Sequence, residues 1–511
     1  MQINNQSKVY DFVIIGSGIG GLVTALVLLK NNYSVCILEK NQQIGGALQV
    51  FSRDKCIFDT GVHYIGGLDE GENLNKIFKY LGIYDDLKLC KLDDEFDIIR
   101  LHNGKSFQLG QGYANFRSFL LKDFPEEAQA IDTFIAKIQE ICAYFPLYNL
   151  VQDGEKTYYN NPEILAINAW EYVSSLTANE ELIATLLGNG FLYAGDRKRT
   201  PLHVVALILN SYIKGSYRIQ DGGAQLVKSL VKQIRNHQGD IFKRKEVCSG
   251  VFNDAGELIG VETTDGVIYY AKQFVSNAHP LKTMELIGEN RFMPATLKRL
   301  RSLRNTVSSF VVNISLKENS FPYFNSNYYD FFTSAVWDET DRDLSEWPYV
   351  LFSCTPKSSK IETFAESISV MTYLHIDAFE QWKSTFNTVC HTSSRGEEYE
   401  LFKRELERKV VDRLCERFPN LKASIKQVYS STPLTFRDYL GTPTGELYGI
   451  EKDFNNSILT TINPKTRIPN LYLTGQSIVF HGILGATIGA LVTSFNFVNG
   501  TDILNSINQV K

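Results

Sequence analysis

A glycine-rich turn that follows a short apolar run near the start of the chain constrains the fold more than any other feature. Residues 10–15 read YDFVII, and GSGIGG follows at 16–21, before the mostly apolar run 22–29. This order predicts a buried strand, a tight turn and a helix. A second apolar run over residues 34–39 predicts a parallel partner strand, which completes one βαβ unit.

The spacing of these glycines is that of a dinucleotide-binding turn. Gly16 permits the turn, Gly18 lets the backbone approach a pyrophosphate, and Gly21 lets helix and strand pack closely. The free N–H groups at the start of the helix stabilise phosphate charge. Glu39 can accept hydrogen bonds from ribose hydroxyls and would repel a 2′-phosphate, so the motif favours FAD or NAD over NADP. The alternative interpretation is that these residues form a glycine-rich turn that binds no ligand.

Three further segments predict contacts with the same cofactor. Gly45 and Gly46 form a second glycine pair that can pass beside a flavin and that a dehydrogenase binding NAD alone does not need. Residues 58–67, FDTGVHYIGG, mix strand formers with glycines, as suits a backbone close to a planar ligand. NLYLTGQ at 470–476 predicts a strand that ends at glycine, and the helix expected from Gly485 would aim its N–H groups at the ligand.

The remaining patterns predict an interleaved α/β (α+β) architecture. DGGA at 221–224 precedes an amphipathic helix over 226–234, and three short β runs up to residue 277 return to the first sheet. We therefore expect a discontinuous, Rossmann-like FAD-binding domain formed by 1–85, 216–285 and 430–511. The blocks 86–215 and 286–429 carry no cofactor motif and are expected to form a mixed α+β substrate-binding domain.

Composition excludes several classes of function. The chain of 511 residues has a formal net charge of -5, which gives no overall attraction to nucleic acid. Its 8 cysteines lie apart, without a Cys-x-x-Cys pair, so we expect reduced thiols and no metal site. Residues 1–12 lack the apolar core of a secretory signal, which predicts a cytoplasmic location with peripheral membrane contact left open. Residues 468–501 contain no charged side chain, but their glycines and polar residues favour a buried strand, loop and helix over a membrane span.

These motifs resemble those of the FAD-dependent phytoene desaturases, carotenoid isomerases and retinol saturases (the all-trans-retinol 13,14-reductase type), a branch of the amine oxidase superfamily. The resemblance covers essentially the whole chain. It rests on FDTGVHYIGG at 58–67, DGGA at 221–224, VSNA at 275–278, TPLTFRDYLGTPTGELYG at 432–449, and NLYLTGQ with GILGATIGAL within 470–491. It implies a fold of the glutathione-reductase/amine-oxidase type. It also implies an FAD site formed by Gly16, Gly18, Gly20, Gly21, Glu39, Lys40, Gly45, Gly46, Ala47, Val247, Gly475, Gln476, Gly485, Ala486 and Thr487.

The function implied by the resemblance is that of an FAD-dependent oxidoreductase acting on carbon–carbon double bonds of a hydrophobic polyene or isoprenoid, of carotenoid or retinoid type. The chemistry is hydride transfer at flavin N5, with saturation slightly favoured over desaturation. The aromatic-rich stretch 321–337 suits the apolar channel that such a substrate needs, although a stripe of this kind is more often ordinary core. With a single complete dinucleotide motif, the sequence leaves the electron donor or acceptor undetermined.

Three alternatives stay open. A carotenoid cis–trans isomerase would use reduced FAD without net electron transfer. An amine oxidase would usually present an aromatic cage beside the flavin. A non-catalytic prenyl- or lipid-binding escort protein shares the fold, but the intact glycine set and Glu39 disfavour it, because lipid binding needs no pyrophosphate site.

Reduction of a double bond takes up a proton as well as a hydride, so we expect a titratable group beside the flavin. His63 and His481 are the candidate catalytic residues, because imidazole titrates near neutral pH and both flank segments predicted to border the flavin. Tyr64 and the run 437–439, Arg-Asp-Tyr, are weaker candidates. A lone histidine is more often a hydrogen-bonded structural residue, which is the favoured interpretation of each one taken singly, and solvent can supply the proton instead.

Overall fold

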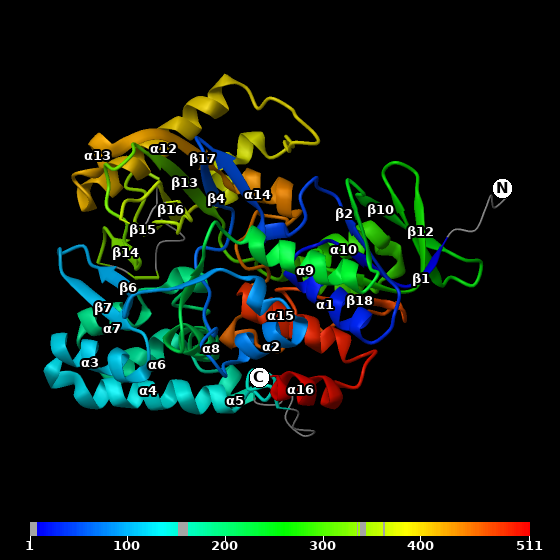
Figure 1. Cartoon of the computed structure of the whole chain (residues 1–511), viewed down its shortest axis with the longest axis horizontal. Helices are drawn as coiled ribbons and strands as arrows, with labels where there is room; N and C mark the ends of the chain where they lie inside the picture. The colour runs from blue at the N-terminus through cyan, green and yellow to red at the C-terminus, as the bar shows by residue number, and fades with distance from the viewer. Residues whose placement is uncertain (1–7, 152–161, 335, 338–343, 361–362, 511) are drawn as a thin grey trace.

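The computed structural model describes residues 8–151, 162–334, 336–337, 344–360 and 363–510, so residues 1–7 of the expected first domain lie outside it. Two seven-stranded sheets organise the chain (Figure 1). The first sheet consists of β1 (Val9–Ile15), β2 (Val35–Glu39), β9 (Asp240–Lys243), β10 (Val247–Phe252), β11 (Leu258–Thr263), β12 (Ile268–Ser276) and β18 (Leu471–Leu473). Its strand order is β10-β11-β12-β1-β2-β9, and β18 pairs with β12.

Strand β1 lies inside the first sheet and pairs in parallel with β2 and β12, as β2 does with β9. Helix α1 (Ile19–Lys30) follows the glycine turn and packs against α9 (Ala224–Asn236) and α15 (Gly482–Ser494). Parallel strands that helices cover read as continuous apolar runs, which explains why residues 10–15 predict a strand so clearly. The predicted βαβ unit and the predicted helix over 226–234 are both present.

Three segments that are far apart in the sequence meet in this sheet. Strands β10, β11 and β12 form an antiparallel meander, and the last three residues of β12 pair in parallel with β18. This return of the β meander to the first sheet was predicted. Helix α15 differs from expectation, because it begins at Gly482 and not at Gly485. A Cβ on Gly485 would lie 2.2 Å from the carbonyl oxygen of Phe480, so this glycine serves close packing inside the first turn.

The second sheet consists of β6 (Glu95–Arg100), β7 (Ser106–Gly110), β13 (Ser309–Leu316), β14 (Asn327–Phe331), β15 (Val350–Cys354), β16 (Ser367–Tyr373) and β17 (Ile425–Ser431). Its order is β17-β13-β16-β15-β14-β6-β7, with β6 and β14 parallel and the other neighbours antiparallel. In Figure 1, a layer of helices lies below this sheet: α3 (Tyr113–Asp123), α4 (Ala128–Ala143), α6 (Ala169–Leu176), α7 (Glu180–Leu187) and α8 (Leu202–Ile213).

The remaining strands and α-helices lie outside these two sheets and the helical layer. They are β3 (Val50–Arg53), β4 (Cys56–Asp59), α2 (Asn73–Leu81), β5 (Leu89–Lys91), α5 (Pro162–Leu165), β8 (Tyr217–Ile219), α10 (Pro280–Ile287), α11 (Pro294–Ser302), α12 (Glu397–Arg417), α13 (Leu421–Ser424), α14 (Pro433–Leu440) and α16 (Gly500–Gln509). Helix α12 packs against β13 and β17 with its few apolar residues and otherwise carries charges of both signs.

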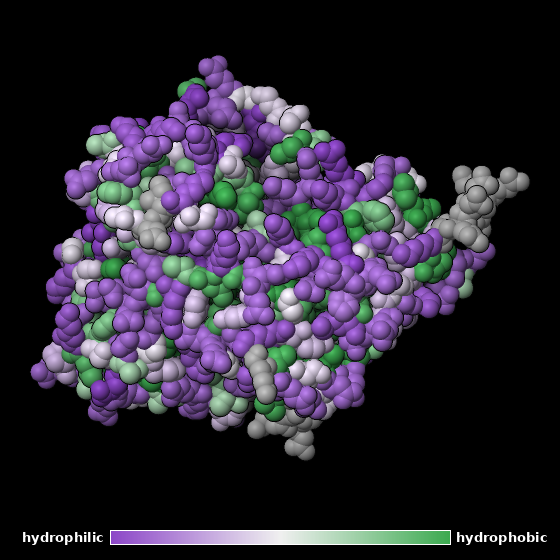
Figure 2. Space-filling model, in the orientation of Figure 1, coloured by the Kyte–Doolittle hydropathy of each residue, from purple (hydrophilic) through white to green (hydrophobic). Residues whose placement is uncertain are grey.

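The buried and exposed surfaces follow the usual pattern of a globular protein. Phe321, Tyr329, Phe331 and Trp337 of the aromatic stretch are buried in the hydrophobic clusters, so they form core. The face shown in Figure 2 is mostly hydrophilic, with hydrophobic side chains in scattered groups.

Within the described residues, no helix combines the length and the apolar character that a membrane crossing requires. The same part of the chain holds no group of three potential metal-ligand side chains.

Candidate cofactor and substrate site

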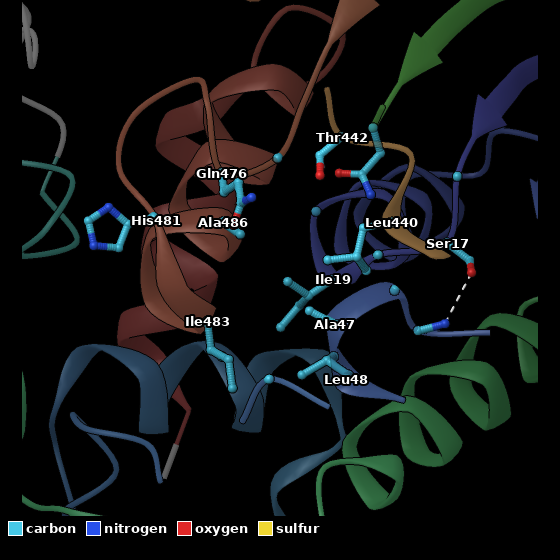
Figure 3. A pocket seen from close by; sticks show the side chains of 18 of the residues that line it. Ser17, Ile19, Ala47, Leu48, Leu440, Thr442, Gln476, His481, Ile483 and Ala486 are labelled. Carbon is cyan, nitrogen blue, oxygen red and sulfur yellow. Dashed lines mark hydrogen bonds between the residues drawn. The ribbon is translucent and has the colours of Figure 1, made fainter. Parts of the chain in front are cut away.

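A cavity of about 320 Å³ opens where β1, β2 and β18 end. Its walls include the glycine turn at 16–20, the end of β2, the 61–66 loop, part of α8 and the start of α15. The carboxyl ends of parallel strands are where α/β sheets bind ligands. Figure 3 shows Ser17 and His481 on opposite sides of this cavity, with Ile19, Ala47 and Leu48 between them.

The glycine turn is closed by the side chain of Asn277, which follows β12. A Cβ on Gly18 would lie 2.6 Å from Asn277 Nδ2, and a Cβ on Gly20 would lie 2.6 Å from Asn277 Oδ1. At Gly21 a Cβ would lie 2.3 Å from the carbonyl oxygen of Gly16. Gly20 and Gly21 meet backbone atoms and therefore exclude a larger residue, and residues 16–20 of the turn line the cavity. The sequence did not single out Asn277, although it belongs to the VSNA motif.

Glu39 is buried at the end of β2, and its carboxylate organises the turn. Ser17 donates both its backbone N–H and its hydroxyl to Oε2, and the backbone N–H of Asn41 donates to Oε1 at 2.8 Å. The Ser17 hydroxyl in turn accepts a hydrogen bond from Gly45 N at 3.1 Å. The dashed line beside Ser17 in Figure 3 marks this bond. Since a carboxylate offers about four acceptor positions, one remains on Oε1 for a ribose hydroxyl.

Most of the expected FAD residues line the cavity: Gly16, Gly18, Gly20, Glu39, Lys40, Gly45, Gly46, Ala47, Val247, Gly475, Gln476 and Ala486. Gly21, Gly485 and Thr487 do not. Gly21 packs against Gly16, as its expected role in helix–strand packing requires. Gly485 packs against the backbone of Phe480 and Thr487 is fully buried, so of the three expected residues in α15 only Ala486 lines the cavity.

The two candidate catalytic histidines have different surroundings. His481 caps α15 and lines the cavity, with Nε2 at 3.1 Å from the carbonyl oxygen of Leu192 and its ring 4.4 Å from that of Tyr448. His63 does not line the cavity, and its ring lies 5.3 Å from that of Phe352. Burial lowers the pKa of each imidazole to about 4, so both are neutral at pH 7.

The weaker candidates at 437–439 form a structural cluster. Both Arg437 and Arg395 make ion pairs with the buried carboxylate of Asp438. Lys40 donates to the carbonyl oxygen of Asp438 at 2.8 Å, and Tyr439 lines the cavity. This cluster therefore holds one wall of the cavity in place.

The residues that line the cavity have the chemistry that an FAD site requires. Its polar part combines the glycine turn, the free acceptor position of Glu39 and the buried hydroxyl of Thr442, which has no partner among the described residues. A buried hydroxyl without a partner is costly, so a ligand that pairs with it is favoured. Its apolar part, with Ile19, Leu48 and Leu440 in Figure 3, suits a planar ring system.

Comparisons with known proteins agree with this arrangement. Residues 14–81 match the NAD(P)-binding Rossmann-like domain. The chain is 27% identical to the all-trans-retinol 13,14-reductase of Danio rerio, over 98% of this chain and 88% of that protein. It is 24% identical to the chloroplastic prolycopene isomerase of Daucus carota, over 92% and 77%. The predicted resemblance to retinol saturases and carotenoid isomerases is confirmed.

Solved structures confirm the fold class. A putrescine oxidase structure matches with a TM-score of 0.64 at 12% identity, over 97% of this chain and 99% of that one. A Rab GDI from Plasmodium falciparum matches with a TM-score of 0.51 at 12% identity, over 96% and 98%. The fold alone is thus shared by an oxidase and by a protein of another class. The sequence relatives are consistent with the predicted enzyme class, an oxidoreductase of the FAD-dependent type.

Proposed function

We propose that this chain, which resembles retinol 13,14-reductases and prolycopene isomerases over nearly its whole length, reduces a carbon–carbon double bond of a hydrophobic polyene with FAD as cofactor. The observation that carries the proposal is a single cavity with two chemically different ends. One end holds the glycine turn and Glu39. The other is lined by apolar and aromatic side chains, namely Leu192, Ile208, Tyr212, Tyr448 and Phe480.

The polar end has the groups that bind the nucleotide. The N–H groups of the turn and of the start of α1 would bind the pyrophosphate, and Glu39 would accept from the ribose. Thr442 and the residues Val247 and Gly475, which also line the cavity, would hold the remainder. FAD, when bound, supplies hydride exchange at N5 with a carbon of the double bond. The apolar end orients the polyene and excludes water from the reacting carbons.

Saturation is preferred over isomerisation, in line with the higher identity of 27% to the Danio rerio reductase against 24% to the Daucus carota isomerase. Isomerisation is the second candidate, because the similarity to the isomerase extends over 92% of the chain. The lipid-escort alternative is disfavoured, because an escort has no use for the pairing of Ser17 and Glu39 beside an open glycine turn.

A polyene substrate is nearly insoluble in water, so we expect the protein to collect it from a bilayer through peripheral contact. Flotation with phosphatidylcholine vesicles, with and without a dissolved carotenoid, tests this point. Co-flotation of the protein with the vesicles supports peripheral membrane contact. If the protein does not float with the vesicles under either condition, this expectation is wrong.

The cofactor part of the proposal is tested by a visible spectrum of the purified protein and by reconstitution with FAD. Bound, oxidised flavin in the native protein, and weaker binding after Glu39→Ala, are the expected results. A colourless protein that does not bind FAD contradicts the proposal and favours the lipid-escort alternative instead.

A further inference from the structure

A buried hydrogen-bonded cluster lies behind one wall of the cavity. The hydroxyl of Tyr64 is 2.6 Å from that of Tyr329 and donates to Asp97 Oδ2 at 3.1 Å. Asn189 Nδ2 donates to the same oxygen at 3.1 Å, and Asn327 Nδ2 donates to Oδ1 at 2.9 Å. Of these five residues, only Tyr64 lines the cavity. The cluster therefore connects a residue of the cavity wall with a carboxyl group that has no exposed surface.

The parallel pairing of β6 and β14 builds this cluster. Its register sets Asn327 beside Asp97 and Tyr329 beside Ile99, so alternate residues of the two strands meet on one face of the sheet. Tyr64 reaches this face from the 61–66 loop, and its ring packs against those of Tyr212 and Phe352. Nothing in this packing requires an acid, since a carboxyl group without exposed surface is costly in a core.

We propose that Tyr64 is the proton donor of the double-bond reduction and that Asp97 is the buried acid that returns a proton to it. The inference rests on the proposed function. Saturation adds a hydride to one carbon, which comes from the reduced flavin, and a proton to the other. The O–H bond of Tyr64 breaks, and a C–H bond forms with the electron pair of the double bond. The resulting phenolate takes the carboxyl proton of Asp97, and the carboxylate regains a proton from solvent.

The electrostatics of the cluster favour the return of a proton from Asp97 to Tyr64. Burial raises the pKa of Asp97 to about 7, against the opposing effect of its three hydrogen-bond donors and of Arg218. Asp97 therefore carries a proton in part of the molecules at neutral pH. Burial also raises the pKa of Tyr64 well above its usual value, so its phenolate does not persist and is reprotonated at once. Tyr193, Tyr212 and Tyr329 also face Asp97, and burial raises the pKa of each.

Their lowered pKa values disfavour the two histidines as proton donors. With a pKa of about 4, neither His63 nor His481 holds a second proton at pH 7. His63 is also outside the cavity wall. Tyr64 and Asp97 thus replace them as the source of the proton.

The first test is an infrared titration of the protein with and without FAD. A carboxylic acid in an apolar site gives a C=O stretch that is absent from carboxylates. Asp59 and Glu451 also have a pKa raised to about 7, so the contribution of Asp97 is the part of this band that is lost around pH 7 in the native protein and is absent from the titration of Asp97→Asn. This readout does not depend on turnover. Absence of an Asp97-dependent band in the native protein overturns the role of Asp97.

The second test follows reoxidation of the reduced, FAD-loaded protein by a carotenoid in a single turnover. Tyr64→Phe should slow it by about 100-fold or more while the Kd values for FAD and carotenoid stay unchanged. Asp97→Asn should slow it and remove the decline of the rate above pH 7. The matched control is Tyr193→Phe, which removes a buried hydroxyl near Asp97 that neither lines the cavity nor joins the cluster, and should react at the native rate.

The outcomes separate this inference from the proposed function. A native protein that reduces the carotenoid while Tyr64→Phe does so equally fast overturns the donor role alone. A native protein that transfers no hydrogen to any polyene overturns the proposed function and the donor role together. If Tyr64→Phe does not fold, Tyr329→Phe shortens the same cluster by one hydroxyl, and an unchanged single-turnover rate and pH profile in that variant also count against the inference.

Discussion

Ser17 donates both its backbone N–H and its hydroxyl to one oxygen of Glu39, and this pair ties the glycine turn after β1 to the end of β2. The Ser17 hydroxyl also accepts from Gly45 N, so the pair holds the second glycine segment as well. Glu39 therefore shapes the site in addition to its proposed contact with a ribose. Its charge matters because hydrogen bonds to a buried carboxylate are stronger than those between neutral groups.

Replacement of Glu39 tests this double role. Glu39→Ala leaves the donors of Ser17 and Asn41 without a partner, each at a cost of about 1–3 kcal/mol. We expect FAD affinity to fall by about 10-fold or more, because about 1.4 kcal/mol corresponds to a factor of 10. Flavin fluorescence quenching measures the Kd. Glu262→Gln, on β11 away from the cavity, is the control, and equal Kd values in both variants would count against the role of Glu39.

Gly21 tests the close packing of strand and helix. In Gly21→Ala the new Cβ would lie 2.3 Å from the backbone oxygen of Gly16, and no side-chain rotation relieves this contact. We expect a loss of about 1–3 kcal/mol in the free energy of unfolding together with weakened FAD binding. In Gly266→Ala a Cβ would meet nothing within 4 Å, so this variant carries only the backbone strain of its φ of +79° and should leave FAD binding unchanged. Urea unfolding and flavin fluorescence quenching compare the two variants. Unchanged FAD binding and stability in Gly21→Ala would contradict the packing argument.

Thr442 and Thr487 both have buried hydroxyls without a partner among the described residues, but only Thr442 lines the cavity. Thr442→Val removes a hydrogen bond to FAD while keeping the shape, so its Kd should rise several-fold, as expected for a loss of about 1 kcal/mol. Thr487→Val should leave the Kd unchanged. Isothermal titration with FAD compares the two, and a larger effect at Thr487 would favour the sequence-based assignment over the geometry.

Asp59, in the 58–67 segment, gives a pH dependence of stability. Burial raises its pKa from 3.8 to about 7, although Gly223 N donates to it at 2.7 Å. A raised pKa means that the folded state binds the proton more tightly than the unfolded state, so this contribution is present below pH 4 and is lost as the pH rises to about 7. Asp59→Asn should therefore flatten the fall in unfolding free energy between pH 4 and pH 7. Urea unfolding across this range measures it, with Asp254→Asn at an exposed position as control. An unchanged slope in Asp59→Asn would show that the carboxyl titrates normally.

Much of the fold could be predicted because its first sheet is encoded in local patterns. The run 10–15, the glycine turn and Glu39 lie within one βαβ unit, and each apolar strand reads clearly where helices cover it. The start of α15 could not be placed, because Gly482 and Gly485 both weaken a helix and only the packing of Gly485 against Phe480 shows which one begins it.

The Tyr64–Asp97 cluster could not be predicted for a different reason. Asp97 and Asn327 are 230 residues apart and meet only through the pairing of β6 and β14, which no local pattern announces. In the sequence, Asp97 is one of four acids within 93–97, DDEFD, and nothing local distinguishes it from the others. The histidines drew attention because of their usual pKa, whereas burial in the fold lowers that pKa and raises the pKa of Asp97 into the neutral range.

The most direct test of the central claim is an anaerobic titration of the reduced, FAD-loaded protein with a panel of retinoids and carotenoids, followed by mass analysis of the products. Reoxidation of the flavin, matched mole for mole by a polyene that has gained two hydrogens, is the predicted result. A polyene of changed double-bond geometry and unchanged mass, formed while the flavin stays reduced, would contradict the saturase and establish the isomerase in its place.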